Sequence, residues 1–281
     1  IAARSSDEII ADPSIDAVLI ATSTDTHSDL IEAATAAGKA VLCEKPVDLS
    51  LERAQACLAA VAQHGQPVMI GFNRRFDPTC GAIQSASNAG EIGKAELLSV
   101  TSFDPAPPPV EYVKVSGGLF RDMMIHDFDM ANFIMGDAPV SVMAVGSSLV
   151  DPAIGAAGDC DTAAVTLTTA SGKICQISNS RRASYGYDQR LEVHGSLGML
   201  RAENKLENTV ESATEDGFAR APAKHFFLER YRAAYALDMA YFINAVTTGT
   251  TPSPDIHDGL RAQILADAAT QSWQTGRPIS I

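Results

Sequence analysis

The sequence predicts an α/β protein in two parts, a parallel sheet followed by an α+β domain with a large, mostly antiparallel sheet. The parallel sheet is indicated by short, continuous apolar runs that alternate with helical patterns, as strands buried on both faces do. The second sheet is indicated by later segments in which polar and apolar residues alternate, which is typical of a sheet with one wet face. With 281 residues, the chain is long enough for two medium domains.

The first part, residues 1–74, is built from strand, helix and strand units. An apolar strand over 16–21 is followed by a helix over 27–37 and a second strand over 40–43. A further helix over 49–64 leads to a third strand over 67–72. Units of this kind cross over in the right-handed sense, so the three strands are expected to be parallel.

The second part, residues 75–281, contains the alternating segments. A rigid, proline-rich loop over 104–109 is expected to line a pocket or to be only a connection. Two long helices are expected over 226–246 and 259–275. We expect another subunit to cover the open face of the sheet. The expected strands are 95–101, 140–145, 162–168, 173–179, 190–194, 199–202 and 206–210.

Composition excludes several classes of protein. The net charge of −13 and the scattered lysines and arginines argue against a nucleic-acid binder, which needs a basic stripe. No apolar run reaches the length of a membrane span, and no signal peptide is visible. The five cysteines are an odd number without metal-ligand spacing, so reduced thiols and a cytoplasmic location are expected.

One stretch carries a candidate proton-transfer site. A helix is predicted to open after Gly117-Gly118, and helical spacing then places Asp122, His126 and Asp129 on one face. A carboxylate beside an imidazole raises its basicity and fixes its tautomer, and histidine titrates near neutral pH. The same pattern also fits a solvated charged face with a chance histidine.

Two further groups of polar residues follow predicted parallel strands, where ligands bind in open α/β sheets. Glu44, Lys45 and Pro46 end the second strand, and the proline restricts Lys45 to an extended backbone. Arg75 follows the third strand and could bind an anionic or polyhydroxyl ligand. A surface ion pair and a surface arginine at a helix start are the alternatives.

Six motifs occur in order along the chain, namely Ala21-Thr22 with His27, Gly38-Lys39, Glu44-Lys45-Pro46, Gly117-Gly118 with Asp122 and His126, Glu192-Val193-His194-Gly195-Ser196-Leu197-Gly198, and Phe227 with Arg230, Tyr231 and Tyr235. Together they resemble the Gfo/Idh/MocA oxidoreductases. Each motif is weak alone, but their order and spacing are specific and cover essentially the whole chain. Within that family the runs 117–129 and 185–189 are most similar to inositol 2-dehydrogenases.

The resemblance implies an incomplete Rossmann-type sheet that binds NAD, with NADP not excluded. The family's glycine-rich fingerprint is not in the sequence, so roughly 50 further residues are expected before Ile1. Ser23-Thr24 also departs from the Pro-Asn common in the family. The cofactor contacts that the resemblance implies are Ala21, Thr22, Ser23, Thr24, His27, Glu44, Lys45 and Pro46.

The implied reaction is oxidation of a ring hydroxyl of a cyclic polyol, with myo-inositol giving 2-keto-myo-inositol as the first choice. Removal of a hydride requires a base for the hydroxyl proton and a cation for the developing alkoxide. His126 is assigned as the base, with Lys45 assisting and Asp122 orienting the site. Arg75, Asp129 and Tyr185 are assigned to the substrate, and a homo-oligomer, a tetramer by resemblance, is expected.

Three alternatives stay open. Another enzyme of the same family would act on a different sugar or sugar derivative. A metal enzyme could use Asp122, His126 and Asp129 as ligands, although no clear fourth ligand is present. A non-catalytic homologue would bind the dinucleotide without turnover.

Overall fold

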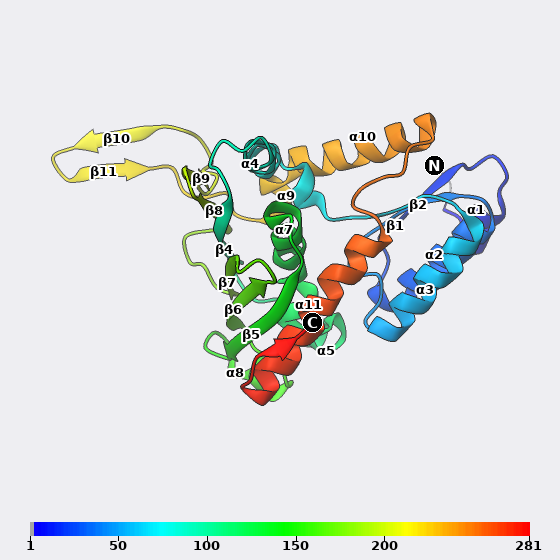
Figure 1. Cartoon of the computed structure of the whole chain (residues 1–281), viewed down its shortest axis with the longest axis horizontal. Helices are drawn as coiled ribbons and strands as arrows, with labels where there is room; N and C mark the ends of the chain where they lie inside the picture. The colour runs from blue at the N-terminus through cyan, green and yellow to red at the C-terminus, as the bar shows by residue number, and fades with distance from the viewer. Residues whose placement is uncertain (1–2) are drawn as a thin grey trace.

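The computed structural model describes residues 3–281 and contains two main sheets, seen at opposite sides of Figure 1. The first is parallel, with the order β1 (Ala17–Ile20), β2 (Ala40–Cys43) and β3 (Val68–Ile70). The crossover helices α2 (His27–Ala36) and α3 (Leu51–His64) connect its strands. This is the Rossmann-like parallel sheet that the apolar runs predict. Shorter elements flank these strands, namely α1 (Ser6–Ala11), η1 (Thr24–Thr26) and η2 (Asn73–Phe76).

The second sheet has seven strands in the order β12-β5-β6-β7-β4-β8-β9. All of its neighbouring strands are antiparallel except β4 and β7, which are parallel. The prediction of a large, mostly antiparallel sheet is therefore confirmed. Its strands are β4 (Ala95–Phe103), β5 (Pro139–Ser147), β6 (Thr162–Thr169), β7 (Ile174–Ser180), β8 (Asp188–Gly195), β9 (Gly198–Ala202) and β12 (Ile279–Ser280).

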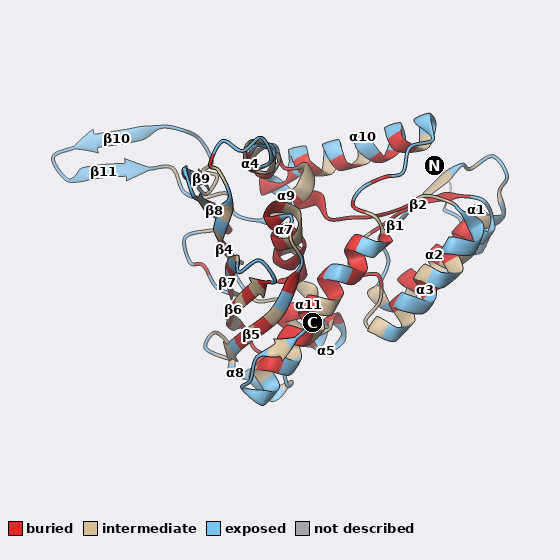
Figure 2. Ribbon diagram, viewed as in Figure 1, coloured by how far each residue is buried: buried red, intermediate tan, exposed pale blue. Residues whose placement is uncertain are grey.

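Helices cover one face of the large sheet. The helix α7 (Ile125–Met135) is almost entirely buried, and α11 (Ile256–Thr275) lies beside it (Figure 2). The indole Nε1 of Trp273 on α11 donates to the Gly146 carbonyl of β5 at 3.0 Å. Along β7, exposed and buried residues alternate strictly up to Asn179, so the opposite face of the sheet is open. Two other helices of this part are α4 (Pro78–Asn88) and α8 (Pro152–Ala156).

The C-terminal helices return to the first sheet. Phe242 of α10 (Arg232–Thr248) packs in one cluster with Leu42 and Met69. On α11, a Cβ added at Gly259 would lie 2.7 Å from the Val47 side chain, so the helix passes very close to the turn after β2. Residues after position 75 thus complete the packing of the first sheet, and the two parts share an extensive apolar contact.

The helix expected after Gly117-Gly118 is divided. The chain forms α5 (Val110–Ser116), then the single turn α6 (Gly118–Asp122), and then α7 after a break at Met123 and Met124. Gly117 and Gly118 both have φ near +80° (+87° and +81°), which costs glycine little and L-residues more. The backbone therefore turns between α5 and α6. Because of the second break, at Met123 and Met124, Asp122 and His126 lie on different helices.

Two other segments differ from expectation. The helix expected over 226–246 is a short α9 (Phe227–Arg230) followed by α10. Residues 206–210 are not a strand of the large sheet, because β9 is already its edge. The chain instead leaves the sheet and forms the exposed hairpin β10 (Glu211–Thr214) and β11 (Gly217–Arg220), which projects from the body in Figure 1. Over residues 3–281, none of the helices has the length and apolar character needed to cross a membrane.

Candidate active site

A cavity of about 890 Å³ lies where the two parts of the chain meet. Its walls include the turns after β2 and β3, the proline-rich loop 104–109, the break between α6 and α7, and aromatic residues near α9 and α10. Carboxyl ends of parallel strands are the usual place for ligands in such sheets. Three predicted catalytic residues line this cavity, namely Lys45, Asp122 and His126.

Lys45 and Asp122 join the two parts of the chain. The Lys45 Nζ atom donates to the main-chain carbonyl of Asp122 at 2.6 Å and lies 3.3 Å from its carboxylate Oδ1. The Tyr112 hydroxyl, from α5, donates to the same Oδ1 at 2.9 Å. Each of the charged side chains is only 16% exposed, so their attraction is weakly screened by solvent. The ammonium is thus fixed at the C-terminal end of α6.

His126 is half-buried and packs edge-on against the ring of Phe72, with the ring centroids 6.1 Å apart. Burial, and after it the positive charges of Lys45 and Arg74, hold the pKa of His126 well below 6.5. The imidazole is therefore neutral at pH 7 and can accept a proton. Within residues 3–281 its Nδ1 atom has no hydrogen-bond partner, so the ring keeps unused hydrogen-bonding capacity inside the site.

A buried ion pair contributes to the cavity wall through its arginine. The Arg74 guanidinium pairs with the Asp127 carboxylate, and the Asn179 amide donates to the other oxygen of Asp127 at 2.8 Å. Burial raises the pKa of Asp127, and the neighbouring Arg74 charge opposes that rise. The pair fixes the start of α7 against β7, and therefore fixes the backbone that carries His126.

Two of the predicted substrate residues contact each other instead of the cavity. Arg75 Nη2 lies 2.5 Å from the Asp129 carboxylate and 2.9 Å from that of Asp258, and none of the three lines the cavity. The reason is electrostatic, because an arginine buried beside two carboxylates satisfies its donors there. Arg75 and Asp129 consequently join α7 to α11 from behind the site.

The predicted substrate residue Tyr185 also lies away from the cavity. Its side chain is 54% exposed and its hydroxyl donates to Asp188 at 2.7 Å. Tyr187 is buried, lines the cavity and packs edge-on against Tyr231. Strand parity predicts that the two tyrosines face one side, but they precede β8 and are separated by Gly186, which has φ +117°. The alternation of a strand does not apply to this turn.

Sequence reasoning missed three residues that line the site. Tyr112 precedes the glycine pair, Arg181 directly follows β7, and Asp104 opens the proline-rich loop. Burial raises the pKa of Asp104 to about 6. For Arg181 a signal was present, since it follows a strand as Arg75 does. Tyr112 and Asp104 carry no local pattern that separates them from ordinary loop residues.

The predicted cofactor residues lie together at the ends of β1 and β2, where His27 and Pro46 are buried. The ring of His27 lies 2.8 Å from the Pro46 carbonyl and 3.2 Å from the Thr22 carbonyl, which ties the two turns together. Ala21, Thr22 and Ser23 are exposed on this edge. The Lys45–Pro46 peptide bond is cis. This edge opens toward the cavity at Glu44 and Lys45.

The alternative of a metal enzyme has no support from the geometry of the described residues. No group of three or more His, Cys, Asp or Glu side chains in residues 3–281 is arranged to hold a metal ion. Asp129 faces Arg75, away from Asp122 and His126. All five cysteines are buried free thiols.

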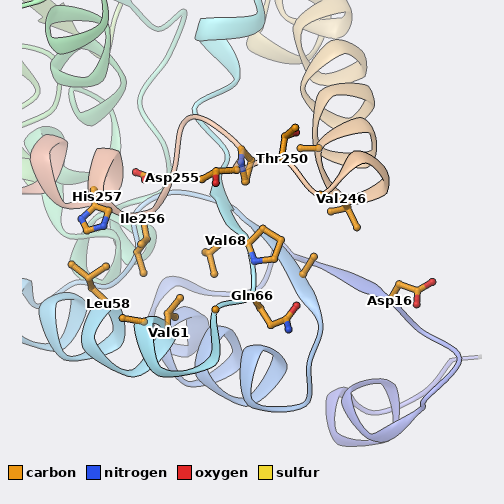
Figure 3. Close-up of a pocket in the computed structure, with 18 residues that line it drawn as sticks. Asp16, Leu58, Val61, Gln66, Val68, Val246, Thr250, Asp255, Ile256 and His257 are labelled. Carbon is orange, nitrogen blue, oxygen red and sulfur yellow. The ribbon is translucent and has the colours of Figure 1, made fainter.

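A second hollow of about 520 Å³ lies at the opposite, amino ends of the same strands (Figure 3). Its labelled side chains include Asp16, Val68, Asp255 and His257. Asp16 precedes β1, Val68 begins β3, and Asp255 and His257 lie at the start of α11. No ion pair or side-chain hydrogen bond among these four is present in the described residues. The cavity at the carboxyl ends, with its linked charges, is therefore the candidate active site.

Comparisons with known proteins cover both parts of the chain. Residues 2–72 match the family of oxidoreductase NAD-binding Rossmann domains, and residues 88–281 match the family's C-terminal α/β domain. The chain is 54% identical to an inositol 2-dehydrogenase of Rhizobium meliloti, over 99% of this chain and 84% of that protein. A myo-inositol dehydrogenase structure from Corynebacterium glutamicum is 44% identical with a TM-score of 0.95, covering 99% and 84% of the two chains. A scyllo-inositol dehydrogenase of Lactobacillus casei, solved with NAD(H) and scyllo-inositol, is 30% identical with a TM-score of 0.90, covering 99% and 83%.

The buried pair of Arg74 and Asp127 should contribute strongly to the free energy of unfolding. Asp127→Ala leaves the Arg74 charge buried without its partner, and we expect the free energy of unfolding to fall by about 3–5 kcal/mol. Glu111→Ala is the matched control, because its pair with Lys114 is exposed and should change the same quantity by less than about 1 kcal/mol. Urea unfolding followed by circular dichroism measures both. Equal costs for the two variants would contradict this account.

Proposed function

The chain belongs to the Gfo/Idh/MocA oxidoreductase family, and on that basis we propose that it oxidises a ring hydroxyl of myo-inositol with NAD. The product is 2-keto-myo-inositol. One observation of the site carries the proposal, namely that Lys45 from the NAD-binding part is bonded to Asp122 beside the neutral imidazole of His126. The names of the relatives support the substrate, since they are inositol dehydrogenases.

His126 is the proposed general base. Loss of a hydride from a carbinol carbon requires that the hydroxyl proton leaves as charge develops on the oxygen. A neutral imidazole in the cavity wall can take that proton, and the low pKa of His126 keeps it neutral at physiological pH. His126 lines the cavity, so a ligand bound there lies beside its ring.

Lys45 is proposed to stabilise the alkoxide. An ammonium has three donors, and two of them are directed to the carbonyl and carboxylate of Asp122. The third donor is free for the substrate hydroxyl, where a fixed positive charge lowers the hydroxyl pKa. Asp122 orients Lys45, and it does so from the C-terminal domain across the cavity. Proton acceptor and cation thus converge on one oxygen.

The cofactor site fits the residues present. The exposed residues Ala21, Thr22 and Ser23, with Thr24 beside them, lie at the carboxyl edge of the sheet, and Glu44 and Lys45 extend this edge to the cavity. His27 is buried and ties the turn after β1 to the Pro46 carbonyl. NAD, when bound there, supplies the hydride acceptor. The chain supplies placement, the base and the cation.

The rest of the substrate contacts is proposed from the cavity walls. Tyr187 and Tyr231 line a largely apolar wall, which suits a ring with polar substituents at its rim. Arg75 and Asp129 support α7 from behind and act on the substrate through that helix. Tyr185, which is exposed, has no contact with this wall.

Turnover and two substitutions test the proposal. The intact protein should reduce NAD with myo-inositol or scyllo-inositol and not with an acyclic polyol of similar size. His126→Asn and Lys45→Met should each lower kcat by about 10²–10⁴-fold, since each removes a general base or a charge stabiliser. Initial rates of NADH formation measure this, with circular dichroism as the check on folding.

Lys114→Met is the matched control for the lysine. This residue is exposed on α5 and pairs only with Glu111 among the described residues, so kcat should stay at the wild-type value. Wild-type turnover in both active-site variants would show that the base and the cation lie elsewhere.

The pH dependence of kcat/KM should reflect the lowered pKa of His126. A base with a lowered pKa stays neutral until the pH falls through that value, so the acid limb of kcat/KM is expected below pH 6.5. Lys45→Gln removes one of the charges that lower this pKa and should move the limb of the residual activity upward. A wild-type limb at or above pH 6.5 would contradict the assignment.

The protein is also proposed to be a homo-oligomer, a tetramer by family resemblance. The open face of the large sheet supports this, because β7 exposes Ile174, Gln176 and Ser178 along one side. Light scattering on the purified intact protein should give a mass of several subunits, and Gln176→Arg should lower it by placing like charges at the interface. A monomer at micromolar concentration would contradict the proposal.

A further inference from the structure

We infer that Arg181 is a positioning residue of this active site, which holds the Asp122 carboxylate and through it the Lys45 ammonium. The inference rests on the proposed function and goes beyond it, because Arg181 belongs to none of the motifs. Arg181 directly follows β7, is only 1% exposed, and lines the cavity with Lys45, Asp122 and His126.

The surroundings of Arg181 are carboxylates. Its Nη2 atom lies 3.7 Å from Asp122 Oδ2 and 4.0 Å from Asp159 Oδ2, and its positive charge also acts on the Asp104 carboxyl. Within the described residues Nε and Nη2 have no hydrogen-bond partner. A buried guanidinium is costly unless negative charge compensates it, so the arginine and these carboxylates require one another.

Arg181 connects the two ends of α6. Asp159 accepts the Leu119 backbone N–H at 3.0–3.1 Å, which anchors the start of this five-residue turn, and Asp122 is its last residue. A Cβ added at Gly118 would lie 2.7 Å from Asp159 Oδ1, so the anchor needs glycine there. A single helical turn is not stable alone. The guanidinium, placed between Asp159 and Asp122, supplies part of the missing support.

The two oxygens of Asp122 are held by different groups. Oδ1 takes the hydroxyl of Tyr112 and the ammonium of Lys45. Oδ2 faces only Arg181 among the residues described. Removal of the guanidinium would free Oδ2 and let the carboxylate rotate away from Lys45. The arginine therefore acts on the reaction through Asp122, with no contact of its own to the reacting atoms required.

A double-mutant cycle tests this role. Arg181→Gln should lower kcat by about 10–10²-fold with KM for inositol and the affinity for NAD nearly unchanged, because the catalytic pair is displaced by about an ångström while the binding walls remain. Arg181→Lys, which keeps the charge, should recover part of the loss. In an Asp122→Asn background, Arg181→Gln should cost less than about 2-fold, since the two residues act as a unit. Arg182→Gln, an exposed neighbour, is the matched control and should leave kcat unchanged.

The outcomes separate the inference from the proposed function. Multiplicative losses in the double variant, or a wild-type kcat in Arg181→Gln, would overturn the inference while inositol turnover by the wild type still stands. If the wild type does not oxidise an inositol, the proposed function fails. The same cycle, read in free energies of urea unfolding, then decides whether Arg181 and Asp122 are coupled, and additive effects would overturn the inference. Arg181→Lys serves in that cycle if Arg181→Gln does not fold.

Discussion

The structure depends on one contact between its two parts, the bond of the Lys45 ammonium to Asp122. Lys45 is held by the end of a parallel strand, and Asp122 by a single turn of helix 77 residues later in the chain. On a solvated surface, the charge of either side chain would be screened by water and its position would not be fixed. Brought together at 16% exposure, they keep a positive charge at a defined point of a cavity that can also hold a ring. Packing of α10 and α11 against the first sheet holds the two parts, and therefore these two residues, together.

Around that contact the charges are arranged in layers. At the cavity, Lys45 and Arg181 compensate Asp122, and Arg74 compensates Asp127. Farther back, Arg75 compensates Asp129. These buried pairs are costly to desolvate, so their value lies in fixing geometry more than in net stability. Burial, together with the positive charges of Lys45 and Arg74, keeps His126 neutral. The proposed base and the proposed alkoxide-stabilising cation can therefore coexist at one pH.

The sequence predicts those features of the fold that depend on local periodicity. Apolar runs identified the three parallel strands, and alternation identified most strands of the large sheet. Lys45, Asp122 and His126 were predicted to meet because strand ends and helical spacing limit where such side chains can lie, and all three line the cavity. The break at Met123 and Met124 was not predictable, since both residues favour helix and only tertiary packing separates α6 from α7.

Pairings between distant residues were also beyond local pattern. Arg75 and Asp129 have the chemistry of polyol ligands, yet these residues, 54 positions apart in the chain, form a buried pair. Tyr185 and Tyr187 are not distinguished by the sequence pattern, because the positive φ of Gly186 between them departs from the alternation of a strand.

The most direct test of the account is a crystal structure of the intact protein with NAD and myo-inositol. It should show one ring hydroxyl within hydrogen-bond distance of both the Lys45 Nζ atom and the His126 imidazole, with its carbon facing the nicotinamide. An inositol bound at the Arg75–Asp129 pair, or with its reacting hydroxyl out of reach of His126, would contradict it.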